Sequence, residues 1–242
     1  MKKVYLTFDM DWASDDVMKY FYEKICNLNI CGTLNVTNDT PILDEIRKGG
    51  RLELGIHPNF NQLLCNDKKE TRSAETIIKN LKDIVPDAVS ARSHSLLTSS
   101  YINQILYENG IRYESNYFYH PDRKMKVRCF KDYMGLMHIP FFYEDDIYLM
   151  STERNTIMQY LDDYDAPLVF NFHPIHIFLN TENMSRYLSA KKYYHTYNQL
   201  KTYRNMNKYG GGACDMLEML VANIHERGYQ FRMIKEIAQE EL

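Results

Sequence analysis

Short runs of β-branched and aromatic residues alternate with longer amphipathic stretches along most of the chain. Residues 3–8 (KVYLTF) form such a run and are followed by acids, which is typical of a buried strand that ends in a loop. Residues 14–28 then place apolar side chains at helical spacing, behind a serine and acids that suit a helix N-terminus. The chain therefore begins with a strand followed by a helix.

The same alternation continues to the C-terminus. Further strands are predicted at residues 32–37, 52–57, 88–93, 113–119, 135–142, 168–172 and 229–234. Further helices are predicted at residues 41–48, 73–84, 99–109, 154–164, 181–204 and 213–226, with a short acidic helix at the end. Strands that alternate with helices at this spacing form βαβ units and a mainly parallel sheet.

The number of strands and the chain length favour one architecture. About seven strands in 242 residues fit an α/β fold of the distorted (β/α) barrel type better than an open doubly wound sheet. No glycine-rich phosphate-binding loop follows the first strand, which argues against a nucleotide-binding fold. No linker rich in proline, glycine or serine interrupts the pattern, so residues 1–242 are predicted to form a single catalytic domain.

The charge and the cysteine content limit which binding partners and which cellular compartment are expected for this protein. The 29 basic and 32 acidic residues give a net charge of −3 and form no basic block, which argues against nucleic acid and anionic membrane surfaces. The apolar run at the N-terminus is too short for a signal peptide, and no stretch is long enough to span a bilayer. The five cysteines include no CxxC pair, which favours reduced thiols. We therefore expect a cytoplasmic protein without membrane insertion.

Acids and histidines follow four of the predicted strands. These strand ends carry Asp9 and Asp11, His57, His94, and His173 with His176. In a parallel barrel the loops that follow the strands meet at one face. Two carboxylates and several imidazoles around one opening form a site for Zn²⁺ or a similar borderline divalent metal.

The motifs that carry these residues also resemble those of a known family. The order of four motifs is similar to that in the polysaccharide deacetylases, carbohydrate esterase family 4. The motifs are TFDMDW at residues 7–12, GIHPN at 55–59, RSH at 92–94 and NFHP at 171–174. The resemblance spans residues 1–176 at least, and the subgroup it points to is associated with surface-polysaccharide biosynthesis. It implies a metal-dependent hydrolase that removes an N-acyl group, expected to be acetyl, from a sugar.

The resemblance also implies a role for each matched residue. Asp9 corresponds to the general base that activates a metal-bound water, and Asp11 to a metal ligand. His57 corresponds to the first of two ligand histidines, and His173 to the general acid that protonates the leaving amine. Arg92 corresponds to a residue of the substrate groove wall, and we assign Trp12, Asn59 and His176 to substrate binding as well.

One position departs from the family pattern. The family's second ligand histidine lies four residues after the first, where this chain has Asn61. An amide oxygen is a poor Zn²⁺ ligand beside imidazole, so another donor is needed. We expect His94 to be that third ligand, because its strand lies beside the His57 strand in a sequentially wound sheet. His176 is the alternative, and a degraded site would leave a protein that binds without cleaving.

A long polar segment follows the strand that ends in His173. Residues 181–212 are rich in tyrosine, lysine and arginine and contain a glycine triplet at 210–212. A connection of this length in a compact domain usually has a function, so we predict a helical lid whose tyrosines stack on sugar rings. The alternatives are a solvated surface helix and, at the glycines, a helix start whose N–H groups bind an anion.

Three functions remain open from the sequence. The first is N-deacylation of a small sugar or glycan by one Zn²⁺-type ion. The second keeps the hydrolysis of a C–N bond but acts on a small non-sugar amide. The third is a catalytically inert carbohydrate-binding relative, which the asparagine at position 61 suggests.

Overall fold

The computed structural model describes residues 2–64, 72–119, 126–150, 158, 160–163, 166–207 and 211–239. Ten strands within these ranges form one sheet. They are β1 (Lys3–Asp9), β2 (Gly32–Val36), β3 (Leu52–Ile56), β4 (Ser90–Ala91), β5 (Tyr113–Glu114), β6 (Phe130–Lys131), β7 (Met137–His138), β8 (Tyr143–Glu144), β9 (Leu168–Phe172) and β10 (Gln230–Arg232). Their order is β6-β7-β5-β4-β3-β2-β1-β9-β8, and β10 pairs with the start of β1.

The sheet is mostly parallel and curls into a half-barrel, as the alternating pattern predicts. The one antiparallel pair among the described strands is β6 with β7. The central strands β1, β2, β3 and β9 are almost entirely buried, as their mainly apolar sequences indicate, and the polar side chains within them are buried as well. Because these strands run in the same direction, the loops after them gather at one end of the sheet.

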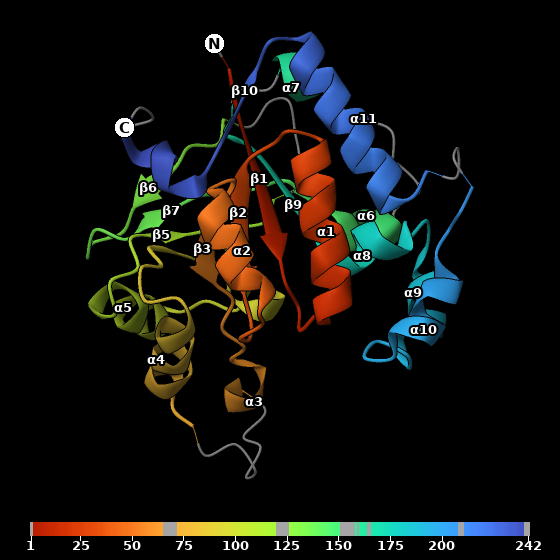
Figure 1. The fold of residues 1–242 in the computed structure, drawn as a ribbon. Coiled ribbons are helices and arrows are strands. Elements are labelled where there is room, and N and C mark those ends of the chain that lie inside the picture. The colour runs from red at the N-terminus through yellow and green to blue at the C-terminus, as the bar shows by residue number, and fades with distance from the viewer. Residues whose placement is uncertain are drawn as a thin grey trace.

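Helices cover the sheet and complete the core. They are α1 (Asp15–Asn27), α2 (Ile42–Gly49), α3 (Asn61–Leu64), α4 (Ala74–Ile84), α5 (Ser100–Glu108), α6 (Asp145–Met150), α7 (Tyr160–Asp163), α8 (Pro174–Leu179), α9 (Met184–Lys191), α10 (Tyr197–Leu200) and α11 (Ala213–Glu226). Figure 1 shows α1 and α2 against the central strands and α9 and α10 beside α8 at the margin of the molecule. No helix in the described ranges has the length and apolar character needed to cross a bilayer.

Several predicted elements differ from the observed ones. The strands expected at 113–119 and 135–142 pair only over the two residues of β5 and the two of β7, with an isolated bridge between Phe118 and Phe141 beyond them. The two-residue strands β6 and β8 were not predicted, because so short a segment carries no periodicity. Most of the helix expected at 154–164 lies outside the described residues, which include only α7 there.

The single helix predicted at 181–204 is wrong. The segment forms α9, then a turn, then α10 and a 3₁₀ turn at Lys201–Tyr203. The break falls on a run of aromatic and β-branched residues with low helix propensity, Tyr193 to Thr196. The N–H groups of Cys214 and Asp215 at the start of α11 both donate to Asn180 Oδ1 (3.1 and 3.2 Å), so they are not available to an anion there.

Candidate metal centre

The loops after β1, β3 and β4 bring three potential metal ligands together. His57 Nε2 and His94 Nδ1 each lie 3.1 Å from the same oxygen, Asp11 Oδ1, and 3.4 Å from each other. Four ligands at 2.0–2.1 Å around a tetrahedral Zn²⁺ have neighbouring donor atoms about 3.3 Å apart. The three separations therefore match the face of a tetrahedral site, and the donor types are those that Zn²⁺ prefers.

Backbone pairing places His94 beside His57. The N–H of Arg92 donates to Ile56 O (3.1 Å), and the N–H of His94 donates to Pro58 O (2.9 Å). This pairing extends the contact between β3 and β4 past the last residues of both strands. His94 therefore lies opposite the loop that follows His57, and its ring contacts the ring of Trp12 edge-on (5.0 Å).

Asn61 does not join this group. It is the first residue of α3, and its side-chain amide donates to Ser95 Oγ (2.9 Å). The structure therefore groups His94, and not Asn61, with Asp11 and His57.

The backbone is left-handed in the loops that carry Asp11 and His94. Asp11 and Trp12 have φ values of 46° and 55°, and Ser95 and Leu96 have 58° and 56°. Non-glycine residues seldom adopt this conformation, which costs about 1–3 kcal/mol each and is found mostly at functional sites. At Asp11 this conformation is the one in which the carboxylate reaches both imidazoles.

Asp9 lies directly beneath this group and is held by amide side chains. Asn35 donates to its Oδ1 (2.7 Å) and Asn171 to its Oδ2 (2.8 Å). Burial raises the pKa of Asp9, but the charges of Arg92, His57 and His173 outweigh it and lower the pKa overall. Asp9 is therefore ionised, and its Oδ1 lies 3.6 Å from His57 Nδ1, which is too far for a hydrogen bond.

Arg92 is buried under the site and does not form a groove wall. Its side chain is fully buried, and it donates to Ser115, Thr7 and Asn171 through its three nitrogens. The structure thus places the guanidinium away from any substrate path and makes it a counter-ion of Asp9 (3.4 Å).

His173 is paired with an aspartate that the sequence analysis missed. Its Nδ1 lies 2.6 Å from Asp145 Oδ1, and its backbone N–H donates to Asp145 Oδ2 (2.8 Å). Burial lowers the pKa of His173, but Asp145 more than offsets this, and the pKa lies well above its usual value. The protonated ring directs Nε2 at Asp11 Oδ2 (3.7 Å), and its position next to the ligand group suits a general acid.

Two more carboxyl groups, Glu144 at the end of β8 and Asp146 in the first turn of α6, lie near His173. Glu144 Oε1 lies 4.0 Å from His173 Nε2, while Glu144 Oε2 and Asp146 Oδ1 are buried without a hydrogen-bond partner. Burial, followed by the charge of Asp146, raises the pKa of Glu144 to about 8. A neutral carboxyl therefore stands beside the charged imidazole, and it can donate a hydrogen bond to a substrate oxygen.

His176 lies behind His173 and away from the three-residue ligand group. Its side chain is buried, its Nδ1 lies 3.1 Å from Thr181 Oγ1, and its ring contacts that of Tyr187 (4.7 Å). Burial lowers its pKa to about 4, so the ring is neutral at neutral pH. His176, which was assigned to substrate binding, is not among the residues that line the cavity beside Trp12 and His57.

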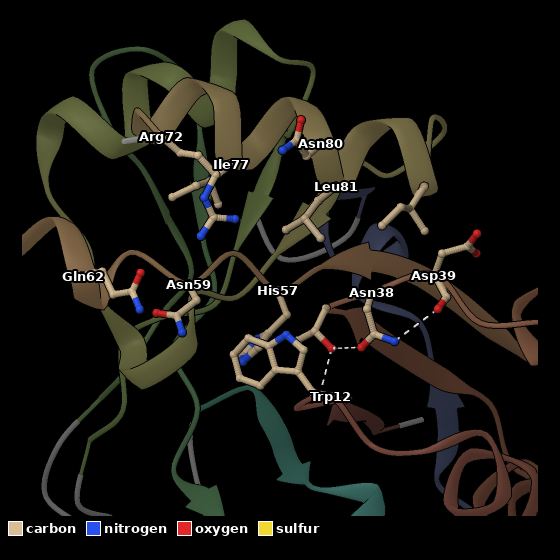
Figure 2. Close-up of a pocket in the computed structure, with 12 residues that line it drawn as sticks. Trp12, Asn38, Asp39, His57, Asn59, Gln62, Arg72, Ile77, Asn80 and Leu81 are labelled. Carbon is tan, nitrogen blue, oxygen red and sulfur yellow. Dashed lines mark hydrogen bonds between the residues drawn. The ribbon is translucent and has the colours of Figure 1, made fainter. Parts of the chain in front are cut away.

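A cavity of about 410 Å³ opens beside the ligand group. Trp12 and Asn59, both expected to bind substrate, line it together with His57 (Figure 2). The indole of Trp12 is 38% exposed, which leaves ring surface for contact with a sugar.

The predicted lid reaches the site through one strong contact. The hydroxyl of Tyr194, in the turn between α9 and α10, donates to the backbone oxygen of Asp11 (2.7 Å). Burial and the charge of Asp11 raise the Tyr194 pKa well above its usual value, so the hydroxyl keeps its proton. The segment thus borders the site and holds the ligand loop, while its movement as a lid stays a prediction.

Known proteins share this sequence pattern and this fold. A family model described as WbmS-like polysaccharide deacetylase matches residues 6–191. A Bordetella bronchiseptica protein designated a polysaccharide deacetylase involved in O-antigen biosynthesis is 31% identical, with a TM-score of 0.82 over 90% of this chain and 89% of its own. A search of curated proteins finds no match.

More distant structures share the fold alone. A family 4 carbohydrate esterase from Streptomyces lividans is 9% identical, with a TM-score of 0.56 over 100% of this chain and 97% of its own. A family 4 acetyl xylan esterase from Clostridium thermocellum, solved with cobalt, is 13% identical, with a TM-score of 0.50 over 98% of this chain and 90% of its own.

Metal content tests the ligand group. We expect the zinc-replete protein to hold about one ion per chain and the Asp11→Ala, His57→Ala and His94→Ala variants to lose most of it, because each removes one of three donors. Elemental analysis of purified protein measures this. Asn61→Ala is the matched control and should keep its metal, whereas metal loss in Asn61→Ala with retention in His94→Ala would reverse the assignment.

Tyr194→Phe tests the contact between the lid segment and the ligand loop. Loss of the hydrogen bond to the Asp11 carbonyl should weaken metal affinity by about 10-fold, as loss of a group that orients a ligand commonly does. Competition with a chromogenic chelator measures the change. Tyr197→Phe, in α10 of the same segment, should leave the affinity at the wild-type value, and equal affinities in all three proteins would contradict this role.

The buried neutral His176 predicts a stability loss in acid. Its folded pKa of about 4 lies below the usual 6.5, so the unfolded chain binds the proton more tightly and stability falls as the pH drops from 6.5 towards 4. The loss is about 3 kcal/mol when complete, at 1.36 kcal/mol per pH unit. Urea unfolding of wild type and His176→Gln across this range measures it. The variant should lose less stability than wild type, and parallel curves would contradict the prediction.

Proposed function

Since this chain belongs to the WbmS-like polysaccharide deacetylase family, we propose that it is a metal-dependent hydrolase that removes an N-acyl group, expected to be acetyl, from a sugar. The observation that carries the proposal is the Asp11, His57 and His94 group, flanked by an ionised Asp9 and a protonated His173. One side of the ligand group thus offers a base and another side an acid.

The ligand group fits a divalent ion, and Zn²⁺ suits its two nitrogens and one oxygen best. Such an ion, when bound, lowers the pKa of water to about 7 and polarises a carbonyl group. The remaining work falls to side chains of the protein.

Asp9 and His173 divide the proton transfers. Asp9 accepts a proton from the attacking water, whose oxygen forms the new bond to the acyl carbon. The C–N bond then breaks, and His173 Nε2 delivers its proton to the departing nitrogen. Asp145 holds the His173 ring in the orientation and charge state for this step. The products are a carboxylic acid and a free amino sugar.

The Bordetella relative suggests a biological setting. That protein is designated as acting in O-antigen biosynthesis, and it shares 31% identity with this chain over most of both lengths. We place this chain in the same kind of pathway, in which a sugar of a surface polysaccharide loses an acyl group.

The inert carbohydrate-binding alternative rested on the asparagine at position 61. Because Asp11, His57 and His94 together form a group that could hold an ion without Asn61, the asparagine by itself no longer argues for a degraded site. The hydrolysis of a small non-sugar amide differs from the proposal only in the substrate, so comparison of acyl release from both substrate classes separates the two.

Two substitutions test the chemistry. Asp9→Asn and His173→Ala should each lower turnover of N-acetylated sugars by about 10²–10⁴-fold, the usual contribution of a general base or acid. Release of acetate and of a primary amine from the same reaction measures turnover, and metal content should stay near wild type. Lys79→Gln on the outer side of α4 is the control with full activity. Wild-type turnover in either variant, or no acyl release by wild type, would refute the proposal.

A further inference from the structure

A second cavity lies at the end of the sheet opposite the Asp11, His57 and His94 group. Its volume is about 500 Å³, within the range of small-molecule sites, about 300–1,000 Å³. Lys3 and Tyr113, the first residues of β1 and β5, line it. The ligand group instead lies just after the last residues of its strands, and β1 to β5 pair in parallel. The two cavities therefore open at different ends of the sheet.

Positive charge is concentrated in this second cavity. Its lining within the described ranges includes one acid, Glu236, and four cations, Lys3, Arg112, Arg232 and Lys235. The whole chain, in contrast, has 32 acidic and 29 basic residues. Cations around one cavity repel each other, and a bound anion offsets this repulsion. The lining therefore favours a negatively charged ligand.

The backbone of Lys235 is anchored while its ammonium group is open to solvent. Lys235 lies in the 3₁₀ turn Ile234–Gln239, which follows β10. Its N–H donates to the buried Glu53 Oε2 (3.0 Å), and the N–H of Ile234 donates to Thr33 Oγ1 (2.9 Å). The Lys235 side chain is exposed, and its ammonium donates to no acceptor in the part of the chain that the structure describes. A ligand can therefore meet this cation without breaking an existing hydrogen bond.

Arg112 is fixed on one edge and open on another. Its backbone N–H donates to Val89 O (2.8 Å), and its Nη1 donates to Tyr107 O (2.9 Å) and Ile111 O (2.8 Å). The central carbon of the guanidinium lies 4.3 Å from the centre of the Tyr107 ring. Its Nε and Nη2 atoms donate to no acceptor among the described residues. Arg112 therefore presents an oriented pair of N–H donors, the arrangement that binds a phosphate through two hydrogen bonds.

The acid of the lining balances only part of this charge. Glu236 Oε2 accepts a hydrogen bond from the N–H of Met233 (2.7 Å), and its Oε1 lies 4.0 Å from Arg232 Nε. An ion pair at this separation near the surface contributes little. Arg232 also donates to Gln230 Oε1 (2.6 Å), which holds its side chain without removing its charge. The lining thus keeps an excess of positive charge.

We propose that this cavity binds a small molecule through a diphosphate group that contacts Arg112, Arg232 and Lys235. An arginine pairs with phosphate oxygens through parallel N–H donors, and a lysine adds a compact charge with three donors. A diphosphate spreads several negative charges over adjacent oxygens, so it can meet cations from three segments at once. The inference is independent of the proposed hydrolysis, whose residues lie at the other end of the sheet.

A bound diphosphate joins distant parts of the chain. Arg112 directly precedes β5, whereas Arg232 ends β10, which lies along the start of β1 (Figure 1). A ligand that binds the folded chain and not the unfolded chain stabilises the fold by mass action. Binding should therefore raise the unfolding temperature as well as give a measurable affinity.

The experiment titrates the protein with inorganic pyrophosphate by calorimetry at constant ionic strength. Wild type should bind about one pyrophosphate per chain, more tightly than inorganic phosphate, and the affinity should fall with added salt. The Asp11→Ala protein should bind pyrophosphate as wild type does, because an ion at the ligand group takes no part. Absence of pyrophosphate binding by wild type, or its loss in Asp11→Ala, would overturn the inference.

Two substitutions locate the site. Arg112→Gln and Lys235→Gln should each weaken pyrophosphate binding by about 10–100-fold, the range for loss of a charge-assisted hydrogen bond. Lys235→Gln should keep the unfolding temperature of ligand-free wild type, because its ammonium holds no other group, so its weaker binding cannot be ascribed to misfolding. Lys19→Gln, an exposed lysine of α1 outside the cavity, is the matched control and should bind as wild type does.

Wild-type affinity in Lys235→Gln, or equal weakening in Lys19→Gln, would overturn the inference. Neither result bears on the proposed hydrolysis, which is measured by acyl release and should proceed at the wild-type rate in Lys235→Gln.

Discussion

The buried guanidinium of Arg92 joins the ends of the strands that carry the candidate site. It donates to Thr7 of β1, to Asn171 of β9 and to Ser115 after β5, and it lies 3.4 Å from the carboxylate of Asp9. Removing one partner from a buried ion pair commonly costs about 3–5 kcal/mol, because the other charge stays buried and uncompensated. The guanidinium of Arg92 therefore links β1, β9 and the residue after β5 through hydrogen bonds to one group. Asp9 and the ligand loop that follows it are positioned by a cation that no substrate needs to touch.

That cation also helps to separate the protonation states of neighbouring acids. Asp9 is ionised because Arg92, His57 and His173 outweigh the effect of burial on its pKa. Asp11 is ionised because its hydrogen bonds to His57 and His94, together with the charges of His57 and His173, outweigh the effect of burial on its pKa. Glu144, only 4.0 Å from the same His173 ring, has its pKa raised to about 8 by burial and by Asp146. Groups whose surroundings drive their pKa values apart can act as acid and base at one pH. The site thus holds charged carboxylates at the ligand group and a neutral carboxyl group on the side of His173.

Much of this arrangement could be predicted from the sequence, and the exceptions have physical causes. Parallel strands read as continuous apolar runs, so their ends could be located, and Asp9, Asp11, His57, His94 and His173 lie together as expected. Asp145 was missed because it follows a two-residue strand whose pattern has no period. The family resemblance assigned Arg92 to the substrate groove wall, and its burial could not be predicted because its hydrogen-bond partners are distant in the chain. The interruption of the predicted helix at Tyr193 depends on the low helix propensity of a few residues, whereas the prediction was based on the polarity of the whole segment.

The fold explains why His94, and not Asn61, lies beside His57. Position 61 is in the turn of α3, whereas His94 follows the adjacent strand β4. The hydrogen bonds from Arg92 to Ile56 and from His94 to Pro58 fix the register between the two loops, so a side chain at 94 must lie beside His57. The left-handed turn at Ser95 and Leu96 then turns the chain, and Ser95 accepts the hydrogen bond from Asn61. Asn61 thus contacts the loop that carries His94, instead of joining Asp11 and His57 itself.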